Sequence, residues 1–348
     1  MINKTETKEK LLYWYQFLPD EYFHGRDIKK IGAWIERPRA PVVFLDSFCT
    51  YEMIKEKKGK STDSHKLQYG RLRELITELI EKGKILSPLC IQEKEIGSPE
   101  KQHEIVDSLM GFTNIDFLAP SIVQSNMEQY AFLSFLKNAN RFPIPFSVVM
   151  NTKSMEGSYR NFRVHISTNI NQAEHKAEEE TKNKTVAQLT ALSESRAKVK
   201  YIDQLEAELS GDLQAFEIQE KKYYSSYYQW KCRQIKGLLQ SIQYSTEKFE
   251  PVQVYKEFLK SSHHTATPSV WIRSVLWAQY ITGHYKPKKS DPNDNAWASV
   301  YLPFTNYCFA DKAFADLIKR TSLEKQFNTK VFSVKQFDQF LTELENML

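Results

Sequence analysis

Apolar residues in the first third of the chain alternate between short continuous runs and a helical repeat. The run PVVFL, residues 41–45, is short and partly β-branched, which is typical of a buried strand. Between Ser64 and Lys82 apolar residues recur every three or four positions and stop at Gly83, which predicts an amphipathic helix. A second strand is predicted at Lys84–Leu89. This order of strand, helix and strand predicts a parallel pair joined by a helical crossover.

The middle of the chain, from about Pro99 to Ile281, has mostly helical periodicity, with Ile144–Met150 as one candidate strand. Within it, residues 172–244 carry apolar residues at spacings near 3.5, with charges between them. This pattern predicts an antiparallel helical hairpin or a short coiled coil, with a break near Gly211.

The last part of the chain returns to alternating elements. Helices are predicted at 268–281, 294–302 and 312–320, with a strand at 306–310 and an edge strand at 331–334. The simplest arrangement is an α/β fold with one parallel sheet flanked by helices and interrupted by a large, mainly α-helical insertion. The predicted boundaries are residues 1–98 and 268–348 for the two parts of the α/β domain and 99–267 for the insertion.

Composition adds few constraints to this picture. With 348 residues and 41% hydrophobic content the chain can bury a full core. The net charge of +5 is too small to identify a polyanionic partner. The cysteines form no CxxC pair and the sequence has neither a cleavable leader nor a membrane span, so we expect a cytoplasmic protein with no membrane partner. The four cysteines are Cys49, Cys90, Cys232 and Cys308.

Acidic residues stand at the ends of the predicted strands. Asp46 directly follows PVVFL, and Asp311 directly follows the strand at 306–310. If these strands are parallel and adjacent, both carboxylates point into one crevice, because open α/β sheets bind ligands at the carboxyl ends of their strands. Taken alone, each aspartate also suits a helix N-cap.

Two further acids belong to the same hypothesis. Glu93 lies just beyond the second strand, with Glu95 as the competing choice. Asp294 falls in the first turn of a helix predicted to have Asp291 as N-cap and Pro292 as its first residue. The helix dipole by itself also favours an acid in that turn.

Three segments that contain these acids, FLDSF, LSPLCIQEKE and DNAWASVYLPFTNYCFADKAFADLIKR, resemble the PIN-domain nucleases in the same order. The resemblance covers about residues 41–97 and 268–334 and implies a PIN-like parallel sheet. It implies that Asp46, Glu93, Asp294 and Asp311 are catalytic ligands of Mg²⁺ or Mn²⁺. Where family members often carry Thr or Ser before the last aspartate, this chain has Ala310.

The resemblance implies hydrolysis of phosphodiester bonds by metal-activated water, which requires no side-chain nucleophile. An endoribonuclease is expected because the family mostly acts on RNA. Two alternatives remain open: a catalytically silent scaffold that works through the helical insertion, and a structure-specific DNA nuclease. A toxin, a phage-defence effector and a housekeeping enzyme are all compatible with the sequence, and the insertion is a candidate surface for a homo-oligomer or a protein partner.

Several groups are candidates for contacting nucleic acid. The predicted phosphate contacts are Lys286, Lys288, Lys289 and Lys312. The run KKYYSSYYQW, residues 221–230, invites base stacking, but its helical spacing favours an interhelical core or an oligomer surface. The adjacent pair His263 and His264 is expected in a polar loop.

Overall fold

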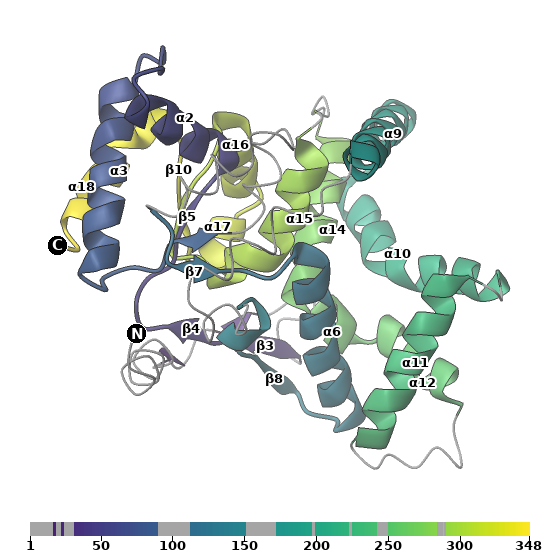
Figure 1. Cartoon of the computed structure of the whole chain (residues 1–348). Coiled ribbons are helices and arrows are strands. Elements are labelled where there is room, and N and C mark those ends of the chain that lie inside the picture. The colour runs from purple at the N-terminus through teal and green to yellow at the C-terminus, as the bar shows by residue number, and fades with distance from the viewer. Residues whose placement is uncertain are drawn as a thin grey trace.

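The chain is a mixed α/β protein in which helices outnumber strands (Figure 1). Among the described residues, no helix combines the length and the apolarity that crossing a bilayer requires. The computed structural model describes residues 17–18, 22–23, 31–89, 112–150, 172–196, 199–222, 225–241, 250–283, 288 and 290–348.

Three parallel strands form the centre of the fold: β5 (Val43–Leu45), β9 (Tyr307–Phe309) and β10 (Lys330–Phe332). Strand β9 lies between the other two and pairs in parallel with both. The prediction that the strand at 41–45 shares a sheet with the strand at 306–310 is therefore confirmed.

A second parallel pair continues this sheet, β6 (Pro88–Leu89) with β7 (Ile115–Asp116). A parallel bridge between Val42 and Leu86 joins the pair to β5. Pro88 has no N–H to donate, which explains why the ladder beside β5 is short. The resulting order is β10-β9-β5-β6-β7, so the sheet extends past residue 98 into the segment predicted as an insertion.

The sheet is buried on both faces, because successive side chains of a strand point to opposite sides. Val43 and Leu45 belong to the hydrophobic core on one face, and Phe44 belongs to the core on the other. In Figure 1, α3 and α18 lie on one side of the strands and α14 and α15 on the other. The first core includes residues of α2 (Ser47–Lys57), α3 (Lys66–Glu81) and α18 (Phe337–Glu345), and the second those of α6 (Pro120–Leu136), α14 (Pro268–Thr282), α15 (Asp291–Tyr301) and α16 (Lys312–Arg320).

Smaller sheets involve residues before β5. Strand β3 (Gly32–Ile35) pairs antiparallel with β2 (Tyr22–Phe23) and parallel with β8 (Arg141–Ile144). The strand predicted at Ile144–Met150 is thus displaced: β8 ends at Ile144, and the next residue, Pro145, precedes a 3₁₀ turn. Strand β1 (Phe17–Leu18) pairs with β4 (Arg37–Pro38), and the 3₁₀ turn is η1 (Phe146–Val148).

The middle region is helical, as predicted, but its helices pair differently. Both α9 (Gln172–Arg196) and α10 (Tyr201–Lys221) pack against α14, which carries buried apolar residues around most of its circumference. Helix α10 continues through Gly211, so the predicted break there is wrong. The next helices are α11 (Ser226–Ser241) and α12 (Pro251–Lys260).

His263 and His264 do not lie in a polar loop. They are buried in the short helix α13 (Ser262–Thr265), where Nε2 of His263 donates to the carbonyl oxygen of Ala139 at 2.8 Å. Nε2 of His264 lies 3.2 Å from the carboxylate of Asp212. Burial lowers the pKa of both imidazoles.

Local sequence signals predicted the ends of most other elements close to where the structure has them. The chain leaves α3 at Gly83, whose φ of +66° lies in the left-handed region that glycine tolerates. Helix α16 has the predicted bounds, whereas α15 begins three residues before Asp294, at Asp291. The remaining short elements are η2 (Leu302–Phe304), α17 (Leu323–Gln326) and η3 (Val334–Gln336).

Candidate metal centre at the strand ends

Asp46 and Asp311 lie together at the carboxyl ends of β5 and β9. The two strands are in parallel register, with Leu45 opposite Phe309, so the residues that follow them share one edge of the sheet. The backbone N–H of Asp311 donates to Oδ2 of Asp46 at 3.3 Å. The two strand ends therefore meet as the sequence predicts.

Both aspartates also cap the helices that follow. A carboxylate oxygen of Asp46 accepts the N–H of Ser47 at 2.6 Å, at the start of α2. Oδ1 of Asp311 accepts the N–H groups of Ala313 and Phe314 at 2.8 and 3.2 Å, at the start of α16. Oδ2 of Asp311 accepts no hydrogen bond from the residues that the structure describes. Capping thus occupies only one oxygen of Asp311.

Asp294 is carried by a helix that packs on both junctions. It is 5% exposed and lies one turn before Trp297, on the same side of α15. The Trp297 ring stacks on Phe44 at a centroid distance of 4.5 Å and meets Phe314 edge-on at 5.0 Å. These rings lie two residues before Asp46 and three after Asp311. Trp297 therefore ties the helix of Asp294 to both strand ends.

Asp291 differs from its predicted role. Ser290 occupies the N-cap position, and Asp291 is the first helical residue. The carboxylate of Asp291 accepts the backbone N–H of Lys288, which holds the preceding loop against the helix. This bond accounts for the burial of an acid that is 2% exposed.

The remaining predicted residues are placed only in part. Glu93, its rival Glu95, Lys286 and Lys289 lie outside the described residues. Lys288 is exposed, and so is Lys312, which is the first residue of α16 and follows Asp311 directly. Across the described ranges, no three His, Cys, Asp or Glu side chains form a group able to hold a metal ion. The four-acid set therefore stays a prediction.

The donor chemistry at the strand ends suits a hard cation. Asp46 is 7% exposed, and a buried carboxylate requires compensation by a positive charge or by hydrogen bonds. The neighbouring thiols of Cys49 and Cys308 are fully buried. Burial, and then the negative charge of Asp46, raises the pKa of both thiols well above the usual value. They remain neutral, so oxygen donors of the type that Mg²⁺ and Mn²⁺ prefer are the ligands that this site offers.

Sequence reasoning missed two side chains beside Asp294. Asn295 is 1% exposed, and neither polar atom of its side chain has a partner among the described residues. The indole N–H of Trp297 is also buried without a described partner. A polar residue inside a stretch whose helical period predicts burial was the available signal for Asn295. Ala310 is fully buried in the core.

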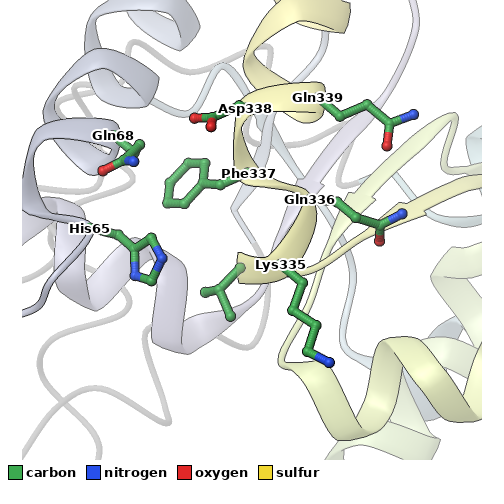
Figure 2. A pocket seen from close by; sticks show the side chains of 8 residues that line it. His65, Gln68, Lys335, Gln336, Phe337, Asp338 and Gln339 are labelled. Atoms are coloured by element: carbon green, nitrogen blue, oxygen red, sulfur yellow. The ribbon is translucent and has the colours of Figure 1, made fainter.

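A pocket of about 400 Å³ lies elsewhere, between the start of α3 and the segment from η3 to α18 (Figure 2). Figure 2 shows His65 and Phe337 on facing sides of it, and their ring centroids are 6.1 Å apart. None of the predicted acids or lysines that fall within the described ranges lines this pocket. It is therefore separate from the strand-end site.

Comparison of the chain with protein-family models, with curated proteins and with solved structures found no match in any of the three.

Proposed function

We propose that the chain is a metal-dependent nuclease with a PIN-like α/β domain, which hydrolyses phosphodiester bonds and acts as an endoribonuclease. The observation that carries this proposal is the meeting of Asp46 and Asp311 at the carboxyl ends of two adjacent parallel strands. The ordered resemblance of the acidic segments to PIN-domain nucleases supplies the reaction class.

The strand order supports a ligand site at this position. Numbered along the chain, the five parallel strands follow the spatial order 3-2-1-4-5. The chain builds outward from β5 in one direction and then returns to add β9 on its other side. Such a reversal leaves a crevice at the carboxyl ends of the two strands, where doubly wound sheets bind ligands. Asp46 and Asp311 are the acids at that crevice.

In the proposed site Asp46, Asp294, Asp311 and the predicted Glu93 hold Mg²⁺ or Mn²⁺. When bound, such an ion lowers the pKa of a water ligand and stabilises negative charge on the phosphate. The exposed side chains of Lys288 and Lys312 are available for phosphate contacts beside the acids. Asp311 supplies Oδ2 while Oδ1 keeps α16 capped.

Replacement of Asp46 by asparagine tests the proposal. Asparagine has nearly the same shape and is a good N-cap, so Asp46→Asn is expected to fold. It should lose Mn²⁺-dependent cleavage of single-stranded RNA. It should also lose the stabilisation that Mn²⁺ gives the parent, about 2.7 kcal/mol at a metal concentration of 100 Kd. Unchanged cleavage by Asp46→Asn would refute the proposal.

A catalytically silent scaffold that works through the helical region is the second candidate. The capping bonds of Asp46 and Asp311 favour it, because they give both acids a structural role without a metal. Calorimetric titration with Mn²⁺ separates the candidates, since only the nuclease predicts binding that Asp46→Asn removes. Cleavage assays with single-stranded RNA, duplexes and DNA flaps then separate an endoribonuclease from a structure-specific DNA nuclease.

A further inference from the structure

Helix α11 has one buried face and one exposed face. The buried face is formed by Tyr228, Lys231, Ile235 and Leu239, and the ring of Tyr228 lies 5.5 Å from that of Phe216 in α10. The sequence-based core interpretation is therefore right for Tyr228. Its neighbour Tyr227 is 49% exposed and so lies outside the core, which leaves the oligomer-surface alternative open for it.

Two aromatic and two basic side chains make up the exposed face, which we call the α11 outer face: Tyr227, Trp230, Arg233 and Lys236. Trp230 is 43% exposed, and its ring centroid is 6.1 Å from that of Tyr227. Residues three apart are neighbours on a helix surface but are turned by about 60° around its axis, so Tyr227, Trp230, Arg233 and Lys236 form an oblique row across the exposed side of α11. Large rings on a surface are costly in water, so this pair requires a reason.

Beneath this face the buried ammonium of Lys231 pairs with a partly buried carboxylate. The Lys231 ammonium lies 2.5 Å from the Glu128 carboxylate of α6, and the hydroxyl of Tyr255 donates to the same carboxylate at 2.5 Å. The same ammonium lies 5.9 Å from the ring centroid of Trp230. These contacts fix α11 against α6 and α12. Tyr227 and Trp230 therefore face the solvent.

The charge on the α11 outer face is positive and uncompensated. Helix α11 contains no acidic residue, and neither Arg233 nor Lys236 forms an ion pair with any residue in the described ranges. The end of α10 adds two exposed cations, Lys221 as its last residue and Lys222 as its C-cap. The exposed positions of α11 include no aliphatic side chain.

We propose that the α11 outer face binds single-stranded nucleic acid, with bases stacked on Tyr227 and Trp230 and phosphates contacted by Arg233 and Lys236. Rings beside cations on one surface are the combination that binds unpaired strands, because every base has a stacking face and every nucleotide a phosphate. Duplexes bind poorly there, since their bases are already stacked. The choice of nucleic acid rests on the proposed function, whereas the surface belongs to a helix that lies away from α2 and α16 (Figure 1).

Fluorescence anisotropy with a labelled 20-nucleotide oligouridine tests this proposal on the full chain. Measurements are made in EDTA, so that binding is recorded without cleavage. The double variant Tyr227→Ala/Trp230→Ala should bind at least tenfold more weakly, and Trp230→Phe should retain most of the affinity because phenylalanine still stacks. Removal of the two cations in Arg233→Ala/Lys236→Ala should make the salt dependence shallower. The negative slope of log K against log salt should shrink in magnitude by about 1.4.

Matched controls lie on other surfaces. Tyr201→Ala removes an exposed ring from α10, and Lys325→Ala/Lys335→Ala removes two exposed cations. Both should bind oligouridine as the parent does. A parent that binds duplex RNA as tightly as oligouridine overturns the proposal, as does equal affinity of Tyr227→Ala/Trp230→Ala and the parent.

Two further results keep this inference distinct from the proposed function. If Tyr227→Ala/Trp230→Ala binds normally but converts a dimer to a monomer in native mass spectrometry, the rings are a contact between copies and the proposal is overturned. If the parent cleaves no nucleic acid, the nuclease proposal fails. Loss of oligouridine binding in Tyr227→Ala/Trp230→Ala would still support the α11 outer face as a binding surface.

Discussion

Asp311 has two roles that substitution can separate, because its two carboxylate oxygens have different partners. Oδ1 accepts two N–H groups of α16, at 2.8 and 3.2 Å. Loss of an N-cap side chain costs about 1 kcal/mol, and loss of a negative charge at a helix N-terminus adds about 0.3–1 kcal/mol. We therefore expect Asp311→Ala to be destabilised by roughly 1–2 kcal/mol. Asp311→Asn retains an oxygen for the cap and should lose only the charge contribution, under about 1 kcal/mol.

The Asp311 variants should rank differently in cleavage activity than in free energy of unfolding. If Asp311 is a metal ligand, Asp311→Asn loses Mn²⁺-dependent cleavage although it folds, because a neutral amide binds a hard cation far more weakly than a carboxylate does. Urea unfolding measures the stability of each variant, and RNA cleavage with Mn²⁺ measures activity. Asp338→Asn, in the exposed first turn of α18, is the matched control for the charge: it should lose a similar dipole contribution, under about 1 kcal/mol, and keep full cleavage. Full cleavage by Asp311→Asn would show that Asp311 acts only as a cap.

Three further predictions concern stability. Lys231→Met should cost about 1–3 kcal/mol in urea unfolding, because it leaves the partly buried Glu128 carboxylate without its cation, and adding Glu128→Gln should recover part of the loss. Trp297→Ala should cost about 3–5 kcal/mol, because it removes the ring between Phe44 and Phe314, and Trp297→Phe should cost less. The free energy of unfolding should fall as the pH drops below about 6.5, because the lowered pKa values of His263 and His264 leave the unfolded chain binding more protons.

Each of these has a clear contrary result. Equal stability of Lys231→Met and the parent would mean that the ion pair contributes nothing net. A Trp297→Ala variant that unfolds at the parent's urea concentration would show that the ring does not hold α15 to the sheet. For the histidines, His264→Gln should flatten the change between pH 7.5 and 5.5, and an unaltered profile would assign the pH dependence to other groups.

Local sequence determined the elements that position the candidate site. A β-branched run followed by aspartate predicted β5 and Asp46, and a three-four repeat ended by glycine predicted α3. The adjacency of β5 and β9, some 260 positions apart, was a condition of the site hypothesis, and the tertiary structure meets it. The individual strands and helices could be predicted because strand and helix periods are properties of neighbouring residues.

The tertiary structure decided which partner covers each apolar face. Periodicity predicts that a helix buries one side, but it does not specify the surface that the side meets. Periodicity therefore did not predict that α9 and α10 pack on α14, or that His263 and His264 are buried in a helix instead of lying in a loop. The same reason applies to KKYYSSYYQW: its spacing predicted a helix, whereas the position of Glu128 on α6 decides that Lys231 turns inward while Tyr227 and Trp230 face the solvent.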